Sequence, residues 1–292
     1  MIVDAVVVHH HNPRALAVTI AHLLAGARQP RRVVVVDNAS TDGPPPVDDD
    51  RVRVVDAGVN GGYGYAVNVG VEALLADPPD AVLALTHETV VEHDCLARLV
   101  ETLDHSGSGS LVGPLLTDNR FGGDLVWSAG GDSTWSGRPR HRLSGRPVAD
   151  VAPQVVDVEW LDGAALLMTV QTWVRVGGFD EGYFLYQEDV DYSRRVRDRG
   201  GRVVCDRRAR AAQGPGNRTG FQALRNGYYY HRRWSSPARR SLWLADELAR
   251  TLVRRRGTVT EAVAGLRAGV HWYRQASAIV RQAPDPGSAE RP

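Results

Sequence analysis

The sequence contains no lysine: all 35 of its basic residues are arginine. This absence excludes enzymes that form a Schiff base with a lysine, and nucleotide-binding proteins that rely on the lysine of a phosphate-binding loop. Cysteine is also scarce, with only Cys95 and Cys205 present. Two cysteines give no disulfide framework and fit a reducing compartment, so we expect a cytoplasmic protein.

Long hydrophobic runs are absent as well. No apolar stretch approaches the ~20 residues of a membrane-spanning helix. The apolar start of the chain, Ile2 to Val8, is too short for a signal peptide. The net charge of +1 gives no general argument for a nucleic-acid partner. The 292 residues suffice for one large domain, or for a domain with an appendage.

The first hundred residues alternate strand and helix patterns. We predict strands at 3–8, 33–36, 52–55 and 81–85, and helices at 12–27, 65–76 and 92–103. The first strand is a continuous apolar run, as expected for a strand that is buried on both faces. This order predicts an α/β fold with a mostly parallel sheet, flanked by helices and joined by right-handed crossovers.

The second half has a different composition. Residues 105–150 are rich in Gly, Ser and Arg, and we interpret them as surface loops with short strands. Further strands are predicted at 155–160, 164–170 and 202–205, with a helix at 188–199. We therefore expect a catalytic domain over 1–215 with halves 1–104 and 105–215, a helical extension over 216–281, and a disordered tail over 282–292.

Polar residues follow two of the predicted strands, where ligands bind in α/β sheets. The segment Asp37–Gly43 offers a carboxylate to a nucleobase or ribose, but its composition also suits a tight Asx-turn. His87 and Glu88 follow the strand 81–85 and form either a cation site or an ordinary polar strand exit. The triplet His9–His11 cannot bind one ion, because adjacent residues of an extended chain point to opposite faces.

A glycine-rich segment, Asn60–Gly64, precedes a predicted helix. Glycines at such a position let backbone N–H groups approach a phosphate. Gly62 and Gly64 match part of the dinucleotide fingerprint, but Val67 occupies the third glycine position, so a nicotinamide-dependent oxidoreductase has little support. A flexible turn is the structural alternative.

The segment Gly177–Arg195 joins an aromatic and glycine-rich stretch to an acidic helix start. Acidic residues first and arginines last suit the helix dipole, which explains some of these charges without any function. It does not explain the aromatic residues that precede them. A carboxylate at a helix start beside Tyr183, Phe184 and Tyr186 is a candidate general base.

These segments, together with Trp160–Met168, occur in an order that resembles family 2 glycosyltransferases, and bacterial rhamnosyltransferase-like members in particular. The resemblance covers roughly residues 1–235, and its most specific part is GGFDEGYFLYQEDVDYSRRVRDRGGRVV. It implies a Rossmann-like GT-A fold and inverting transfer of a sugar from a nucleotide diphosphate donor. dTDP-rhamnose or a UDP-sugar is the implied donor.

The resemblance also implies site roles. Asp189 matches the catalytic base, with Glu188 beside it. The nucleotide-sugar site would comprise His10, Asp37, Asn38, Asn60, Gly62, Tyr63, Gly64, Asn68, Arg225 and Asn226, with one imidazole of the histidine triplet packing on the base. The acceptor side would comprise Trp160, Asp162, Gly163, Ala164 and Tyr186.

The implied metal site departs from the family pattern. Glu88 stands where the family usually has Asp, and Gln213 stands where it commonly has His. Glu88, with His87 and Gln213 as further candidates, would hold Mg²⁺ or Mn²⁺ in a weakened site, and whether the enzyme needs the cation or can dispense with it stays open. The arginines 218, 225 and 232 are candidates to share the neutralisation of the diphosphate.

Three questions stay open. The acceptor is either a lipid-linked saccharide of the cell envelope or a secondary metabolite. The arginines and tryptophans of the C-terminal helices suit either peripheral contact with the inner face of the plasma membrane or a helical cap with a basic outer face. The departures at Glu88 and Gln213 also keep a non-catalytic binder of sugar nucleotide or glycan as an alternative.

Overall fold

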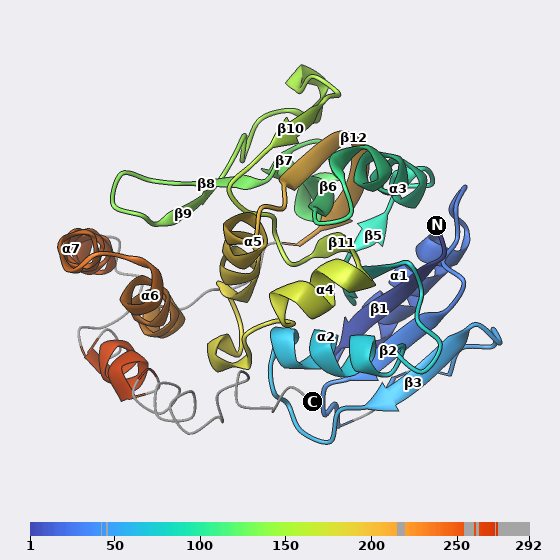
Figure 1. Ribbon diagram of the computed structural model, residues 1–292, viewed down its shortest axis with the longest axis horizontal. Helices are drawn as coiled ribbons and strands as arrows, with labels where there is room; N and C mark the ends of the chain where they lie inside the picture. Colours follow the sequence, from blue (N-terminus) through green and yellow to red (C-terminus); the bar gives the residue numbers. More distant parts are fainter. Residues whose placement is uncertain are drawn as a thin grey trace, which may run out of the picture. The chain divides into compact units, whose positions relative to one another are not determined.

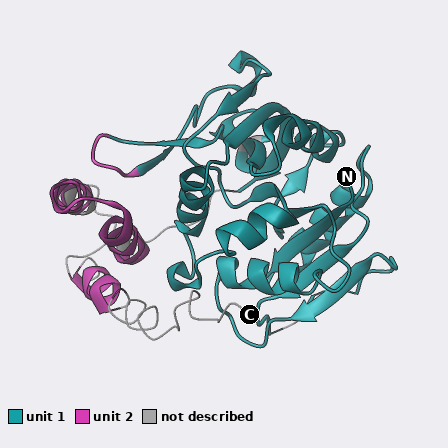
Figure 2. Ribbon diagram, in the orientation of Figure 1, with its two compact units in different colours: residues 1–134, 139–216 teal, residues 135–138, 217–292 magenta. Residues whose placement is uncertain are grey.

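The structure, a computed structural model, describes residues 1–41, 43–44, 46–214, 220–253, 260, 263–271 and 273. The chain forms two compact units (Figure 2). Unit 1 comprises residues 1–134 and 139–216, and unit 2 comprises residues 135–138 and 217–292. The predicted tail and Arg218 lie outside the described residues.

The element bounds are as follows. The strands are β1 Val3–His9, β2 Val33–Asp37, β3 Val52–Asp56, β4 Ala81–Thr86, β5 Val90–Val91, β6 Leu111–Asp118, β7 Val126–Ser128, β8 Gly131–Ser133, β9 Pro139–His141, β10 Val155–Asp157, β11 Ala165–Thr169 and β12 Val203–Gln213. The helices are α1 Pro13–Leu24, α2 Tyr63–Glu72, α3 Cys95–Ser106, α4 Val170–Val176, α5 Glu188–Asp198, α6 Gly220–Trp234 and α7 Pro237–Val253. Short 3₁₀ turns are η1 Asn119–Phe121, η2 Val148–Asp150 and η3 Glu181–Tyr183.

A central mixed sheet organises unit 1 (Figure 1). Its main strand order is β10-β12-β6-β11-β4-β1-β2-β3. Strands β4, β1, β2 and β3 are parallel neighbours, and so are β12 and β6, whereas β11 runs antiparallel to both β4 and β6. The first half of the chain therefore forms the parallel part of the sheet, and its strands end at one common edge.

Helices cover both faces of this sheet. Alternate residues of β1 divide between two cores: Ala5 and Val7 pack on the side of α1 and α3, while Val6 and Val8 pack on the side of α2, α4 and α5. Burial on both faces accounts for the continuous apolar strand patterns of the sequence. The two cysteines are free and buried in these cores.

The interpretation of residues 105–150 as surface loops with short strands was wrong for β6. All eight residues of this strand are buried between β11 and β12. Pro114 interrupts the apolar pattern and cannot donate a backbone hydrogen bond, which normally argues against a central strand. The partner strand adapts, because a bulge in β12 begins at Asp206, the residue paired with Pro114.

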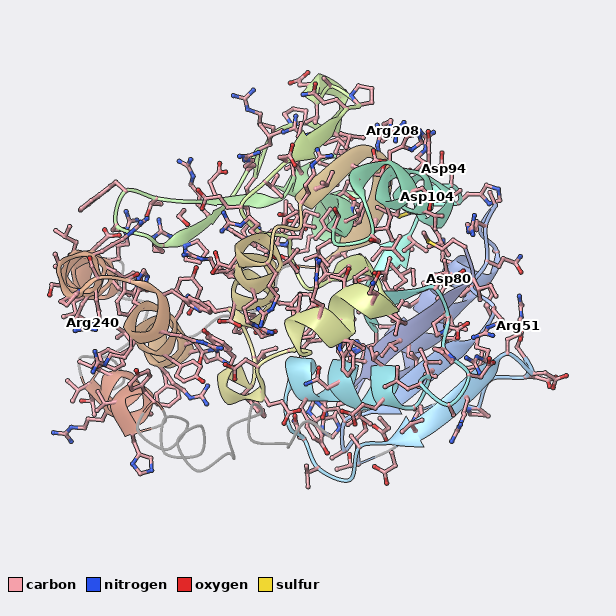
Figure 3. The ribbon with its side chains drawn as sticks, in the orientation of Figure 1. Arg51, Asp80, Asp94, Asp104, Arg208 and Arg240 are labelled. Carbon is pink, nitrogen blue, oxygen red and sulfur yellow. The ribbon has the colours of Figure 1, made fainter. Side chains whose placement is uncertain are left out.

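Three further boundaries differ from the sequence prediction. Strand β12 continues from Val203 to Gln213, through the bulge where Arg208 lies next to α3 (Figure 3). The predicted strand 155–160 ends at Asp157, and Trp160 forms only an isolated bridge. The run of β-branched residues after β11 is helix α4, because the Thr169 hydroxyl accepts from the Thr172 N–H (3.0 Å) and caps the helix.

Unit 2 contains α6, α7 and the tip of the β8–β9 hairpin. The His231 ring stacks on the buried Trp243 at 4.7 Å between centroids. The Ser136 hydroxyl of the hairpin tip donates to Asp246 of α7 (2.8 Å). Among the helices that the structure describes, none is long and apolar enough to cross a membrane.

Candidate active site

Three residues predicted for the nucleotide site meet where β1 and β2 end. The Asn60 amide N–H donates to His10 Nε2 (3.3 Å), and Asn38 Nδ2 donates to Asn60 Oδ1 (3.0 Å). Since Nε2 accepts, Nδ1 carries the ring proton and donates to the Asn38 carbonyl (3.0 Å). The structure thus brings His10, Asn38 and Asn60 together into one hydrogen-bonded rim at the edge of the sheet.

Asp37 is the last residue of β2 and is buried. Its Oδ1 accepts from the Ser40 N–H (3.1 Å), and Ala39 between them has φ +58°. The sequence composition suggested a tight turn, and the structure has one, with the Asp37 side chain bonded to the N–H three residues on and not two as in an Asx-turn. A nucleotide role for Asp37 stays a prediction.

The histidine triplet does not alternate as an extended chain would. His9 is buried with its ring 5.3 Å from that of His87, and burial lowers the pKa of both imidazoles. His11 has φ +54°, so its ring turns back onto His10 at 4.0 Å. The prediction of strict alternation was wrong between His10 and His11. Within the described residues, no group of three or more His, Cys, Asp or Glu could hold a metal.

The glycine-rich segment packs against the stretch that precedes α5. Gly62 has φ +89°, and a Cβ there would overlap the Phe184 carbonyl. A Cβ at Gly64 would lie 2.9 Å from the Phe179 side chain. The Tyr63 N–H donates to the Phe184 carbonyl (2.9 Å). These glycines therefore permit a close backbone contact with the loop before α5, a role that the phosphate interpretation did not foresee.

Asn68 also stabilises the contact between the glycine-rich segment and the loop before α5. Its side chain accepts from the Phe179 N–H (2.8 Å) and donates to the Phe179 carbonyl and to Glu181 (3.0 Å each). A Cβ at Gly178 would lie 2.8 Å from its Oδ1. With its amide engaged in three hydrogen bonds, Asn68 is placed to support the loop, and its contacts favour that role over direct nucleotide binding.

Asp189 lies in the first turn of α5 and is held by two backbone amides. The Gly163 N–H donates to Oδ2 (2.9 Å), and the Val190 N–H donates to Oδ1 (2.7 Å). The Tyr63 hydroxyl donates to the Gly163 carbonyl. A continuous set of contacts thus joins the start of α2 to the carboxylate of Asp189 through Gly163.

Two opposing influences set the charge of Asp189. Burial and the nearby charge of Asp162 raise the pKa of Asp189 to about 7, against the two amide hydrogen bonds that lower it. Burial and the neighbouring carboxylates Glu188, Asp189 and Asp162 raise the pKa of Tyr63 well above its usual value. Tyr63 therefore stays a hydrogen-bond donor, while Asp189 has the proton affinity of a general base at neutral pH.

Asp162 sits among aromatic side chains from a different part of the chain. Its Oδ1 accepts from the Ala164 N–H (3.0 Å), and its Oδ2 accepts from Trp127 Nε1 (3.4 Å). His141 Nδ1 lies 3.9 Å from the same Oδ2, and its ring packs on Trp127 and Trp160. The sequence analysis named Trp160, Asp162, Gly163 and Ala164 but missed Trp127 and His141. Their only sequence signal is aromatic residues within a Gly- and Ser-rich segment.

The approach to α5 is strained and firmly anchored. Phe184, Tyr186 and Gln187 all have φ between +64° and +72°. Inside the helix, the buried Asp191 and Arg195 form an ion pair (2.7 Å), and the Tyr183 hydroxyl lies 3.3 Å from Asp191. Backbone strain of about 1–3 kcal/mol per residue persists only where surrounding contacts fix it, and it gathers at functional sites. Glu188 is buried at the helix start.

Two of the three candidate metal ligands lie close together, and the third bonds to threonine hydroxyls. Glu88 is about half exposed, with its Oε1 3.8 Å from His87 Nε2 and 3.5 Å from Asn12 Nδ2. Gln213 Oε1 instead accepts from the hydroxyls of Thr89 (2.6 Å) and Thr86 (3.2 Å). A single exposed carboxylate still fits Mg²⁺, which proteins often hold through one or two carboxylates plus substrate phosphates.

Arg225 and Asn226 lie in unit 2, on α6. Arg225 Nη1 donates to Asn226 Oδ1 (2.6 Å), and burial lowers the pKa of Arg225. Arg232 packs over the Tyr273 ring at 5.0 Å. Their proposed contacts with a diphosphate stay predictions.

Residues 4–146 match the family model described as glycosyl transferase family 2. This match covers just under half of the chain and, with the relatives below, supports a place in this family. The family match ends before Asp162 and Asp189, so their assignment depends on the geometry above and on the sequence motif.

Sequence relatives are rhamnosyltransferases. The N-acetylglucosaminyl-diphospho-decaprenol L-rhamnosyltransferase of Mycobacterium tuberculosis (strain ATCC 25618 / H37Rv) is 29% identical over 200 residues, which cover 61% of this chain and 64% of the relative. The chain thus spans less than two thirds of the length of that relative.

Solved structures support the predicted GT-A fold. GalNAc-T7 with UDP, GalNAc and Mn²⁺ has a TM-score of 0.65 at 15% identity, covering 97% of this chain and 58% of that one. The mannosyltransferase PcManGT of Pyrobaculum calidifontis, in complex with GDP-Man and Mn²⁺, has a TM-score of 0.56 at 16% identity, covering 97% and 81%. The prediction of a GT-A fold is confirmed.

Proposed function

We propose that this chain is an inverting glycosyltransferase that moves a sugar from a nucleoside diphosphate to an acceptor hydroxyl. The proposal depends on the position and pKa of Asp189. Its carboxylate lies at the start of α5 and accepts hydrogen bonds from two backbone amides, and its pKa is raised to about 7. A base with this proton affinity is well matched to a hydroxyl acceptor at neutral pH.

In the proposed reaction, Asp189 takes the proton from the acceptor hydroxyl. The acceptor oxygen forms a bond to the anomeric carbon while the bond from that carbon to the diphosphate oxygen breaks on the opposite face. The nucleoside diphosphate leaves with the bonding electrons. Tyr63 keeps Gly163 in place, and so keeps the Gly163 N–H on the Asp189 carboxylate. Glu88 would hold Mg²⁺ or Mn²⁺, which when bound neutralises the charge of the departing diphosphate.

The donor and acceptor follow from the relatives by analogy. The Mycobacterium relative is named for rhamnosyl transfer to a lipid-linked diphosphate sugar. On that basis we favour dTDP-rhamnose over a UDP-sugar as donor, and a lipid-linked saccharide over a secondary metabolite as acceptor. A non-catalytic binder is the second candidate, because Gln213 is committed to two threonine hydroxyls and adds nothing to the metal site.

Donor binding tests the proposal directly. Calorimetry with UDP-, dTDP- and GDP-sugars should find one nucleotide that binds with Mn²⁺ or Mg²⁺ and binds at least tenfold more weakly in EDTA. Glu88→Ala should reproduce the loss. Glu92→Ala is the matched control, an exposed carboxylate on the same segment. If a donor binds equally well in EDTA, arginines and not a cation neutralise the diphosphate. If none of the sugar nucleotides binds, the proposed function is refuted. A donor that binds but never turns over with any hydroxyl acceptor would favour the binder.

A membrane-linked acceptor also predicts lipid binding by unit 2. Residues 217–245 of this unit contain six arginines and no acidic residue. Within unit 2, Arg239 is exposed, Arg240 is partly exposed (Figure 3), and Trp135 and Leu242 are exposed by 74% and 50%. Arginines beside exposed apolar groups suit an anionic bilayer surface.

Sedimentation with vesicles measures this contact. We expect the protein to pellet with vesicles containing anionic phosphatidylglycerol and to remain in solution with pure phosphatidylcholine. The double variant Arg239→Ala/Arg240→Ala should bind about thirtyfold more weakly, since each arginine near an anionic surface contributes about 1 kcal/mol. Arg14→Ala/Arg53→Ala removes two exposed arginines of unit 1 as the control. Equal losses in both double variants would contradict a specific surface on unit 2.

A further inference from the structure

His141 and Asp162 face each other beside the catalytic base. His141 ends β9, and its Nδ1 lies 3.9 Å from Asp162 Oδ2. Asp162 immediately precedes Gly163, whose N–H binds Asp189. The two carboxylates therefore flank one glycine, and the imidazole approaches this pair from the side of Asp162.

The imidazole is held in this orientation by aromatic rings. Its centroid lies 4.8 Å from that of Trp127 and 4.9 Å from that of Trp160. Trp127 Nε1 donates to the same Asp162 oxygen (3.4 Å). Trp160 is fixed in turn, because its indole covers Gly131, where a Cβ would overlap the ring. His141 is thus packed into the site by two tryptophan rings.

The charges around this group favour a cation at His141. Asp189 on α5 and Tyr63 on α2 both interact electrostatically with the Asp162 carboxylate. On the neighbouring β8, the carboxylate of Asp132 is already paired with Arg142 (2.5 Å). A nearby negative charge opposes the ionisation of a carboxylate, so the charge of Asp162 raises the pKa of Asp189. An imidazolium next to Asp162 offsets this effect. An imidazole can supply that charge near neutral pH.

We propose that His141 is a positioning residue for the base: as an imidazolium it pairs with Asp162, and this pairing keeps Asp189 ionised for proton transfer. The inference rests on the proposed function, because it requires Asp189 to act as the general base. It adds a residue from the β8–β9 hairpin to the electrostatics of the reaction.

The pH dependence of kcat/KM tests the proposal. The wild-type rate should fall as pH drops through about 7, because protonated Asp189 cannot accept a proton. Asp162→Asn removes the opposing negative charge and should move this limb to lower pH by about one unit. His141→Gln should move it to higher pH. His22→Gln, at an exposed histidine of α1, should leave the limb in place. A lower rate in His141→Gln without a shift of the limb would overturn the proposal.

A second readout does not depend on activity. Imidazole titrations followed by ¹H–¹⁵N NMR identify His141 by the signal that is lost in His141→Gln. Its midpoint should move to lower pH in Asp162→Asn, because the imidazolium loses its anionic partner. An unchanged midpoint would refute the His141–Asp162 pairing. If the midpoint moves but no acceptor is ever glycosylated, the pairing stands and the proposed function fails.

Discussion

Replacing Asp189 with asparagine should lower the rate of glycosyl transfer by about 10²–10⁴-fold, the usual contribution of a general base. An asparagine of nearly the same shape keeps one acceptor oxygen, so it can retain the hydrogen bond from the Gly163 N–H or from the Val190 N–H, but not both. Donor affinity measured by calorimetry should stay within about twofold, because the change affects the transition state and not donor binding.

Asp198→Asn is the matched control for this variant. Asp198 is the last residue of the same helix and pairs with Arg194 in solvent (3.0 Å), so its loss should leave the rate unchanged. Activity of Asp189→Asn within tenfold of wild type would reject Asp189 as the base. A loss of donor binding in step with the rate would instead point to a collapsed site.

Replacing Gly62 with alanine should produce the largest loss of stability. Gly62 has φ +89°, and its Cβ would overlap the Phe184 carbonyl, which also accepts from the Tyr63 N–H. Either the turn or the loop before α5 must move. We expect the free energy of unfolding to fall by about 2–4 kcal/mol. The melting temperature should fall by about 5–10 °C.

Gly58→Ala separates backbone strain from collision. Gly58 also has a positive φ, +74°, but nothing lies within 4 Å of a Cβ there. Its substitution should cost about 1 kcal/mol through strain alone. Differential scanning calorimetry of the two variants therefore measures the Phe184 contact by difference. Equal melting temperatures of the two variants would show that the loop before α5 can move away from a Cβ at position 62 without further loss of stability.

The parallel half of the fold was predictable because its signal is local. Runs such as 33–36 and 81–85 are apolar throughout, and burial on both faces of the sheet gives only that pattern. Strand β6 carries no such signal: its Pro114 is accommodated by a bulge in a strand some ninety residues further along the chain. The residues around Pro114 therefore cannot show that a distant partner strand forms a bulge opposite it.

The candidate site shows the same division. The motif around Asp189 pointed to a carboxylate that the structure holds on two backbone amides. The sequence motifs also named His10, Asn38 and Asn60, which the structure brings into contact. The sequence did not indicate that Asn68 and the glycines support the loop before α5, since the contact joins segments more than a hundred residues apart. His141 was not named either, because its Gly-, Ser- and Arg-rich segment carries no motif that singles out one residue.

The hairpin that carries His141 has a practical consequence for dissecting the protein. Its tip, residues 135–138, belongs to unit 2, where Ser136 and Arg138 contact Asp246. The chain thus passes between the units three times, after residues 134, 138 and 216. Cutting the gene after codon 216 would leave Ser136 and Arg138 without Asp246, directly before the strand β9 that carries His141. Chimaeras that exchange the helical unit between relatives should therefore exchange the hairpin tip with it.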